Sequence, residues 1–176
     1  MKKIKVAVNG YGVIGKRVVE AVTLQDDMEL VGVGDVAADW RIKVADAKGY
    51  PLFANTEEGR KAMNEQNISV AGDLDDMLSK ADLVVDCAPA KFGAKNAEKY
   101  KLAGIKYIVQ GGEKHEATGH SFSAENNYSS AINRESTRVV SCNTTSIVRT
   151  LSALKRAGLL EKARGTLLRR ATDPWE

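Results

Sequence analysis

The chain has 176 residues, of which 43% are hydrophobic and 28% are charged, and its formal net charge is +3 at pH 7. These values are typical of a globular protein, and the scattered basic residues do not indicate a nucleic-acid partner or an anionic membrane surface. No apolar run approaches the ~18 residues that a membrane-spanning helix needs. The two cysteines lie far apart and do not form a disulfide framework, so we expect a cytoplasmic protein with reduced thiols.

The spacing of apolar residues predicts strands that alternate with helices along the chain. Continuous Val-rich runs are typical of strands buried on both faces, whereas apolar residues three or four positions apart indicate helices. In chain order, we expect a strand at 4–9, a helix at 14–22, a strand at 28–34, a helix at 38–49, a short strand at 50–54, a polar helix at 56–67, a short strand and a helix capped by Asp73 within 69–81, a strand at 81–89, a helix at 92–104 closed by Gly104, a strand within 105–114, a loop region at 115–136, and a strand followed by a helix within 138–158.

This alternation predicts a Rossmann-type α/β fold with a doubly wound, mostly parallel sheet. Ligands of such sheets bind beyond the carboxyl ends of the strands. The unusual residues of the chain stand at these predicted ends, which are 10–15, Asp35, 87–89, 110–113 and 141–144.

A glycine-rich motif, G-x-G-x-x-G, connects the first predicted strand to the first helix. Gly10 permits a tight turn, Gly12 lets the backbone approach a pyrophosphate, and Gly15 lets the helix pack close to the strand. Asp35 stands twenty residues after Gly15, at the distance where a carboxylate accepts hydrogen bonds from ribose hydroxyls. Without that context the motif is a glycine-rich turn and Asp35 a solvated loop residue. With it, we predict a dinucleotide site.

A cysteine stands where the last predicted strand meets the last helix. The positive end of a helix stabilises a thiolate, and Ser141, Asn143 and Thr144 beside Cys142 offer hydrogen-bond donors to an oxyanion or a phosphate. The residues alone leave two interpretations open, which are a nucleophile and a small apolar residue that ends a strand. Cys87 follows a very apolar strand, and packing is the better interpretation for it.

The two histidines do not form an obvious site. His115 and His120 are one residue too far apart for an H-E-x-x-H zinc motif, and a separation of five does not stack two side chains on one helix face. We expect no metal site and place both side chains in a solvated loop. A base for Cys142 is therefore one of these histidines, brought close by folding, or is not in this chain.

Five segments of the chain are characteristic of one known family, and these are VNGYGVIGKRV, LQDDMELVGV, QGGEKHE, RVVSCNTTSIVRTL and LLRRATDP. With them the chain resembles the archaeal-type phosphorylating glyceraldehyde-3-phosphate dehydrogenases, and the resemblance covers residues 1 to 176. Members of this family are about twice as long as this chain, with an N-terminal Rossmann domain and a C-terminal catalytic domain, and form homotetramers. The resemblance implies a dinucleotide-binding domain at 1–140 and the first helix and strand of a truncated catalytic domain at 141–176. It also implies that the family's catalytic histidine lies beyond the end of this chain, so that the chain alone binds a dinucleotide without turnover.

The resemblance also implies roles for individual residues. Cys142 matches the nucleophile, and Ser141, Cys142 and Asn143, with Thr144 beside them, match the substrate-binding segment. Cofactor contacts are implied for Val13, Ile14, Arg169 and the loop of Gln110, Gly111 and Gly112. The implied reaction oxidises and phosphorylates glyceraldehyde 3-phosphate with inorganic phosphate, through a cysteine thioester, to 1,3-bisphosphoglycerate.

The choice of cofactor is predicted from Asp35. Family members commonly carry a lysine after the second strand, which suits the 2′-phosphate of NADP, whereas Gly34-Asp35-Val36 stands there in this chain. A carboxylate accepts hydrogen bonds from the hydroxyls of NAD and repels the phosphate of NADP, so we predict a preference for NAD, with NADP possible because basic residues lie nearby. Two other functions remain open: another aldehyde or semialdehyde dehydrogenase, and a non-catalytic dinucleotide-binding module.

Overall fold

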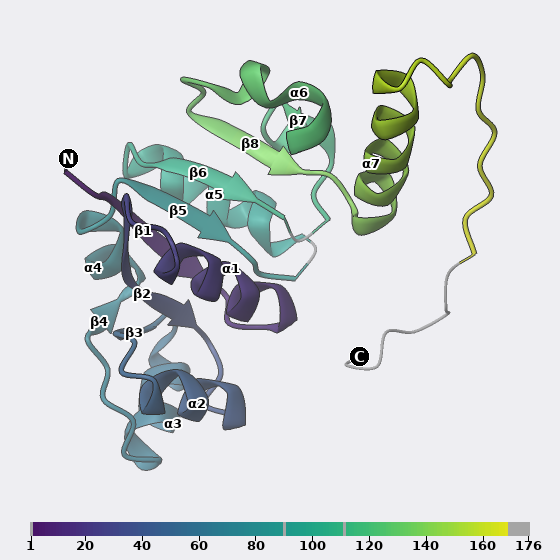
Figure 1. The fold of residues 1–176 in the computed structure, drawn as a ribbon. Coiled ribbons are helices and arrows are strands. Elements are labelled where there is room, and N and C mark those ends of the chain that lie inside the picture. Colours follow the sequence, from purple (N-terminus) through teal and green to yellow (C-terminus); the bar gives the residue numbers. More distant parts are fainter. Residues whose placement is uncertain (1, 90, 111, 169–176) are drawn as a thin grey trace.

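The computed structural model of the chain describes residues 2–89, 91–110 and 112–168, and within them eight strands form a single parallel sheet (Figure 1). The strands are β1 (Ile4–Asn9), β2 (Met28–Asp35), β3 (Leu52–Ala54), β4 (Gly72–Asp73), β5 (Leu83–Asp86), β6 (Lys106–Val109), β7 (Ser121–Phe122) and β8 (Ser136–Val139). The helices are α1 (Val13–Thr23), α2 (Trp40–Ala47), α3 (Glu57–Glu65), α4 (Leu74–Ser79), α5 (Phe92–Leu102), α6 (Ala124–Ala131) and α7 (Cys142–Arg156), with a 3-10 turn at His115–Ala117. The predicted Rossmann-type fold is confirmed.

The sheet order is β4-β3-β2-β1-β5-β6-β8-β7, and every adjacent pair is parallel. The carboxyl ends of all strands therefore lie along one edge of the sheet. Chain order runs outward from β1 in one direction to β4, then returns to β5 on the other side of β1. This reversal between β1 and β5 is the point at which ligands of doubly wound sheets bind.

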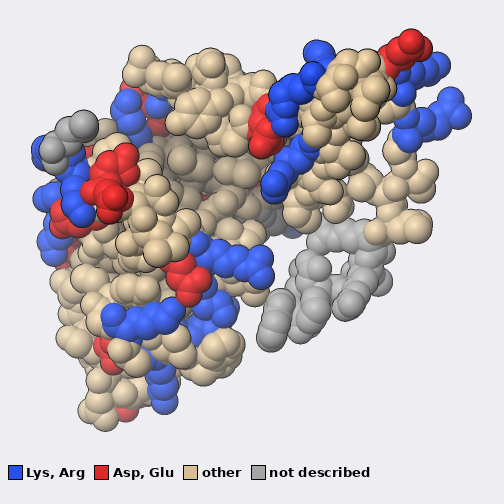
Figure 2. Space-filling view, viewed as in Figure 1, with Lys and Arg blue, Asp and Glu red and all other residues tan. Residues whose placement is uncertain are grey.

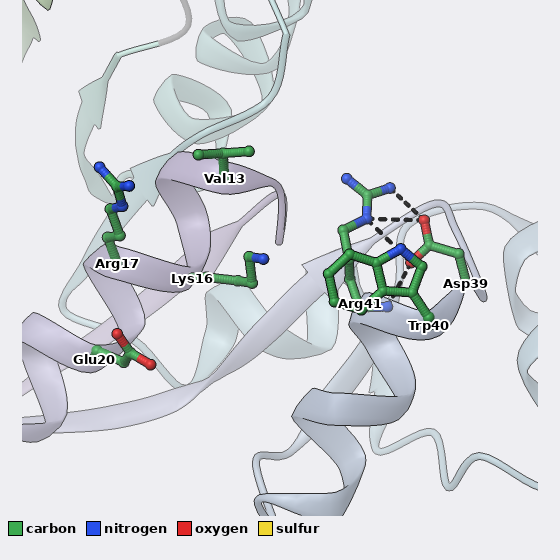
Figure 3. A pocket seen from close by; sticks show the side chains of 7 residues that line it. All are labelled: Val13, Lys16, Arg17, Glu20, Asp39, Trp40 and Arg41. Atoms are coloured by element: carbon green, nitrogen blue, oxygen red, sulfur yellow. Dashed lines mark hydrogen bonds and ion pairs between the residues drawn. The ribbon is translucent and has the colours of Figure 1, made fainter. Parts of the chain in front are cut away.

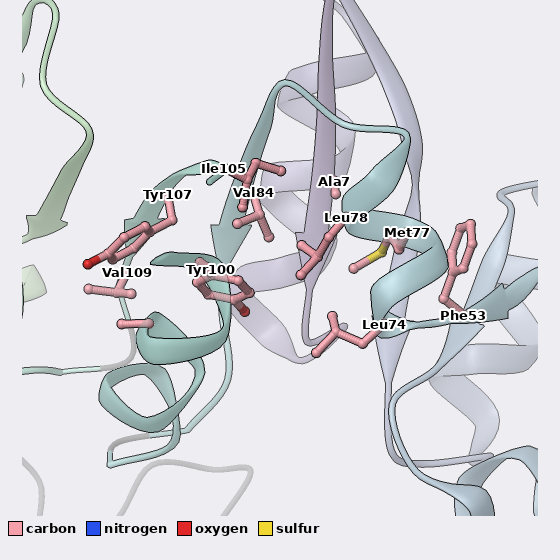
Figure 4. Packing of buried hydrophobic residues seen from close by; sticks show 11 residues of the cluster. Ala7, Phe53, Leu74, Met77, Leu78, Val84, Tyr100, Ile105, Tyr107 and Val109 are labelled. Carbon is pink, nitrogen blue, oxygen red and sulfur yellow. The ribbon is translucent and has the colours of Figure 1, made fainter. Parts of the chain in front are cut away.

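The helices cover both faces of the sheet, and a separate core fills each face. On one face, α1, α2 and α3 bury Val19, Ile42 and Met63 against β1, β2 and β3. On the other face, Met77 of α4 and Tyr100 of α5 pack against β1, β5 and β6, in the cluster drawn in Figure 4. Both faces are apolar, which explains why the central strands are continuous apolar runs without alternation.

Local sequence signals set several helix ends. Asp73 accepts a hydrogen bond from the backbone of Asp76, whose carboxylate accepts one from the backbone of Asp73, so the predicted cap is a complete capping box. Thr56 caps α3 through its side chain. Gly104 has a φ of +65° just after α5, the left-handed conformation expected where a helix closes.

One predicted region is more ordered than the sequence indicated. Residues 115–136 form a 3-10 turn, strand β7 and helix α6 in place of the expected loop. Helix α7 packs beside α6, where Arg156 and Glu125 form an ion pair of 2.9 Å, and it buries none of its own residues (Figure 1). No helix in the described residues is both long and apolar enough to span a bilayer.

Candidate functional site

The glycine loop joins β1 to α1 at the point where the sheet order reverses. Gly10 has a φ of +96°, and a Cβ there would lie 2.9 Å from the backbone nitrogen of Ala88. A Cβ on Gly15 would lie 1.9 Å from the carbonyl oxygen of Gly10. Only glycine fits at either position, because the loop folds back on itself against the end of β5. The geometric roles predicted for Gly10 and Gly15 are therefore supported.

The start of α1 is open to a ligand. Gly12 is the N-cap residue and provides no side-chain cap for the first turn. A Cβ on Gly12 would meet only a guanidinium nitrogen of Arg41, at 3.8 Å, and the first two helical residues, Val13 and Ile14, are 38% and 46% exposed. The uncapped N–H groups and the helix dipole together favour an anion at this position.

Asp35 lies at the last position of β2, as predicted, and its carboxylate holds the glycine loop. One oxygen accepts a hydrogen bond from the backbone nitrogen of Tyr11 at 2.7 Å. The other accepts from the backbone nitrogens of Val36 and Ala37 at 2.7 and 2.9 Å. A carboxylate has about four acceptor positions, so one remains for a ribose hydroxyl.

A surface pocket of about 520 Å³ opens beside the glycine loop, between α1 and α2 (Figure 3). It is lined by Val13, Lys16, Arg17, Glu20, Asp39, Trp40 and Arg41. The ammonium of Lys16 lies 4.8 Å from the centre of the Trp40 ring. Its lining contains side chains of both charge signs, and both signs are also present on the face of the molecule drawn in Figure 2.

A buried polar cluster, which the sequence analysis missed, lies beneath the carboxyl end of β5. The fully buried carboxylate of Asp86 accepts hydrogen bonds from Tyr100, from Asn96 at 2.8 Å and from the backbone nitrogen of Ala88 at 2.9 Å, while Asn9 lies 3.3 Å away. Burial, followed by the charge of Asp86, raises the pKa of Tyr100. The one sequence signal was that two apolar strands end in polar residues, Asn9 and Asp86.

The two cysteines differ in their surroundings. Cys87 lies at the end of β5 against the core, and Gln110 donates a hydrogen bond to its sulfur at 3.0 Å. Burial is the main cause that raises its pKa to about 12, so packing is the right interpretation for Cys87. Cys142 is exposed, and it is the first residue of α7.

The residues around Cys142 partly engage one another. The hydroxyl of Ser141 caps α7 by accepting a hydrogen bond from the backbone nitrogen of Thr144 at 3.2 Å, and the hydroxyls of these two residues lie 2.9 Å apart. The side-chain oxygen of Asn143 is 4.0 Å from the sulfur of Cys142. Ser141 is therefore first a helix cap, and Asn143 lies beside the thiol.

The prediction that both histidines are solvated is wrong for His120. Its ring lies within 2.7 Å of the hydroxyl of Thr137 and 2.9 Å of that of Ser130, and it is 7% exposed. Burial, with Arg134 and His115 nearby, lowers the pKa of His120. The sequence hid this burial because β7 and α6 form from a polar segment. His115 is exposed and contacts Ser121 at 2.9 Å. Among the described residues, no three His, Cys, Asp or Glu side chains could together hold a metal ion.

The loop after β6 contains a second feature that the sequence did not reveal. The carboxylate of Glu113 is buried and points at Gly93, in the first turn of α5, where a Cβ would lie 2.4 Å from one of its oxygens. Neither oxygen has a hydrogen-bond partner in the described part of the chain. Gly112 has a φ of +99°, whereas Gly111 and Arg169, both predicted cofactor contacts, lie outside the described residues.

The structure thus brings together the predicted residues at the ends of β1 and β2 and places Cys142 further along the same edge. Because β5 and β6 lie between β1 and β8, the ends of β1 and β8 are three strand spacings apart, about 14 Å. Gln110 follows β6, between the glycine loop and Cys142.

The chain is similar to a protein family model and to several named proteins. The family model described as dihydrodipicolinate reductase, N-terminus, matches residues 4–144. The glyceraldehyde-3-phosphate dehydrogenase of Methanococcoides burtonii is 49% identical over 174 residues, which are 99% of this chain and 52% of that protein. That of Archaeoglobus fulgidus is 49% identical over 177 residues, with 100% of this chain and 52% of that protein covered. The chain spans about half the length of these relatives.

Among solved structures, the WlbA dehydrogenase of Bordetella pertussis, in complex with NADH and UDP-GlcNAcA, has a TM-score of 0.49 and 22% identity, and the match covers 67% of this chain and 30% of that one. The resemblance inferred from sequence motifs is confirmed by the relatives named glyceraldehyde-3-phosphate dehydrogenase, which match nearly the whole chain. The glycine loop and Asp35 lie at the ends of β1 and β2 of this Rossmann-type domain. The chain belongs to the family described as dihydrodipicolinate reductase, N-terminus.

Proposed function

We propose that this chain is the dinucleotide-binding part of a phosphorylating glyceraldehyde-3-phosphate dehydrogenase. The observation that carries the proposal is the 49% identity to enzymes of that name, over nearly the whole chain, together with an open glycine loop beside Asp35. Residues 1–140 form the dinucleotide-binding domain, and 141–176 begin the catalytic domain. The separation of α7 from both cores supports this division.

The glycine loop and the start of α1 hold the pyrophosphate of the cofactor, and the free acceptor position of Asp35 takes a ribose hydroxyl. When bound, the nicotinamide ring accepts a hydride. NAD is preferred over NADP, since the carboxylate of Asp35 would repel a 2′-phosphate by ~4 kcal/mol at 4 Å and an effective dielectric of 20. Gln110, Gly111, Gly112 and Arg169 complete the cofactor contacts, as the resemblance implies.

Cys142 is the nucleophile in this proposal. Its thiolate attacks the aldehyde carbon of glyceraldehyde 3-phosphate to give a hemithioacetal. This hemithioacetal would become a thioester by losing its hydride to the bound nicotinamide and its hydroxyl proton to a base, and inorganic phosphate would then displace the Cys142 thiolate to give 1,3-bisphosphoglycerate. The exposure of Cys142 at the first position of α7 supports this role, and Ser141, Asn143 and Thr144 supply nearby polar groups.

The general base is supplied from outside residues 1–176. This part of the proposal rests on the contacts of the two histidines, whose hydrogen-bond partners in the described chain are Ser121, Thr137 and Ser130 and do not include Cys142. The same observation favours a second candidate function, a dinucleotide-binding module without catalysis. The complete enzyme is a homotetramer, as the resemblance implies, and the two unpaired cysteines of this chain suit the reducing cytoplasm.

Calorimetric titration of NAD into this chain tests the proposal, with Gly12→Val as the informative variant. A valine side chain would fill the space above the loop, so we expect the Kd for NAD to rise at least tenfold, as ~1.4 kcal/mol of lost binding would give. Gly165→Val is the matched control because no atom lies within 4 Å of a Cβ at that position. Equal Kd values for the two variants would refute the site, and phosphate-dependent reduction of NAD by this chain alone would refute an external base.

A further inference from the structure

Asp39 and Arg41 form a close ion pair at the mouth of the pocket between α1 and α2 (Figure 3). The Nε of Arg41 donates to both oxygens of Asp39, at 3.1 and 2.9 Å, and one terminal nitrogen makes a further short contact. Asp39 is also the N-cap of α2, since it accepts a hydrogen bond from the backbone nitrogen of Arg41 at 2.9 Å. The pair is therefore fixed both by side chains and by the helix.

The two partners shift the pKa values of each other in opposite directions. The hydrogen bond from Arg41 is the main cause that holds the pKa of Asp39 below its usual value, and the same bond raises the pKa of Arg41. The side chains of Arg41 and Asp39 are 34% and 36% exposed, so a ligand can reach the guanidinium from the pocket.

Arg41 lies beside the glycine loop and lines the pocket between α1 and α2. Its guanidinium is 3.8 Å from the Cβ position of Gly12, and Asp35 contributes to the shift of its pKa. In dinucleotide-binding domains, the acidic residue near Asp35's position reads the 2′-hydroxyl, and a nearby arginine accommodates a 2′-phosphate. Arg41 is thus placed to bind that phosphate, but its guanidinium is already bonded to the carboxylate of Asp39.

We propose that Asp39 weakens the binding of NADP relative to NAD by occupying Arg41, so that a 2′-phosphate finds the arginine neutralised. This inference rests on the proposed function, because it assigns a specificity residue to the same dinucleotide site. NAD leaves the ion pair intact. NADP must exchange a carboxylate for a phosphate at Arg41, and the displaced charge of Asp39 then lies unpaired near that phosphate.

The other charged groups of the pocket do not perform the same task. Glu20 forms an ion pair of 3.0 Å with Lys48, and it lies in the second half of α1, away from Gly12. Lys16 lies over Trp40 and Arg17 follows it on α1, and both attract either dinucleotide through its pyrophosphate. Asp39 is the group that directly opposes Arg41.

The test measures the Kd of NAD and NADP for this chain and for Asp39→Ser. Serine retains the helix cap and removes the charge, so α2 should be preserved. We expect Asp39→Ser to bind NADP about tenfold more tightly, because a charge-assisted bond from Arg41 becomes available, while the Kd for NAD changes less than about twofold. Asp39→Asn, which also caps helices, provides the same measurement if the serine variant unfolds.

Two further variants identify the mechanism. Arg41→Gln, added to Asp39→Ser, should abolish the gain in NADP affinity. Asp46→Ser removes an exposed carboxylate from the other end of α2 and should leave the NADP-to-NAD ratio unchanged. An unchanged ratio in Asp39→Ser, or a gain that persists without Arg41, overturns the inference.

The same titrations separate this inference from the proposed function. A parent chain that binds neither dinucleotide overturns both. A parent that binds NADP more tightly than NAD overturns the assignment of NAD to Asp35, while the inference about Asp39 is overturned only if its ratio test fails.

Discussion

Cys87 and Cys142 each follow a parallel strand at the same edge of the sheet, yet their surroundings are opposite. Cys87 follows β5 in the middle of the sheet, where neighbouring strands, the glycine loop and Gln110 enclose it. Cys142 follows β8, the second strand from the edge, and opens α7 in solvent. Two cysteines at equivalent positions after a strand can thus differ in exposure, because the neighbouring elements decide how far each is enclosed.

The difference arises from the connection between each strand and its next helix. After β5, the carboxylate of Asp86 binds the backbone of Ala88 and turns the chain back over the sheet before α5 begins. After β8, only Val140 and Ser141 separate the strand from α7. The first connection leaves its cysteine partly buried, whereas the second presents its cysteine, exposed, at a helix N-terminus.

Removal of the buried carboxylate of Asp86 should have the largest effect on stability. We expect Asp86→Ala to lower the free energy of unfolding by about 3–5 kcal/mol, because it leaves Asn9, Asn96 and Tyr100 without their common partner in the core. Urea denaturation measures the change. Asp26→Ala, at an exposed aspartate, should stay within about 0.5 kcal/mol of the parent. Similar losses in both variants would show that the cluster does not hold the end of β5.

Alkylation rates distinguish Cys87 from Cys142 directly. A thiol with a pKa of about 12 is ionised to about one part in 10⁵ at pH 7, and Cys87 is also enclosed. We therefore expect iodoacetamide to modify Cys142 at least ~100-fold faster than Cys87 at pH 7, as read by mass spectrometry.

The pH dependence of this reaction has a definite sign. Because the pKa of Cys87 is raised, its thiolate fraction should grow about tenfold per pH unit between pH 7 and 11 without a plateau. In concentrated urea the two thiols should react at similar rates, which provides the control. Equal rates in the folded chain would contradict the assignment of Cys142 as the reactive thiol.

The cap of α7 gives the smallest of these effects. Ser141→Ala should destabilise α7 by about 1 kcal/mol, because the backbone nitrogen of Thr144 loses its acceptor. Hydrogen exchange should report faster exchange in the first turns of α7 and no change in β5. Ser146→Ala, at an exposed position inside the same helix, is the matched control. Faster exchange in β5 would mean that the cap of α7 also affects the middle of the sheet, which would contradict this expectation.

The local signals of the sequence predicted most of this fold. Val-rich runs indicated the central strands, and the glycine spacing with Asp35 indicated the loop that joins β1, α1 and β2. Such signals act over a few residues, so they can be recognised in the chain itself. The polar segment 115–136 lacked them, since its strand forms by pairing with β8 and its helix by packing against β7 and α7.

The remaining parts of the site could not be predicted because they are pairings across the chain. No local sequence pattern indicates that Asn9 bonds to Tyr100 or that the carboxylate of Glu113 points at Gly93. Asp39 and Arg41 are only two positions apart in the sequence. The position of this pair beside Gly12 depends on the fold and could not be predicted from that spacing. Side-chain partners at the edge of the sheet therefore had to be seen in the structure.

The cluster around Asp86 also bears on how the domain folds. Its bonds connect Asn9 with residues 46, 77 and 91 positions away, namely Asn55, Asp86 and Tyr100. Contacts of such long separation form late, after much loop entropy has been lost. The contacts of Asn9 are therefore complete only when residues 9 to 100 have assembled, and a chain in which α5 has not yet packed lacks the hydroxyl of Tyr100 at the end of β1.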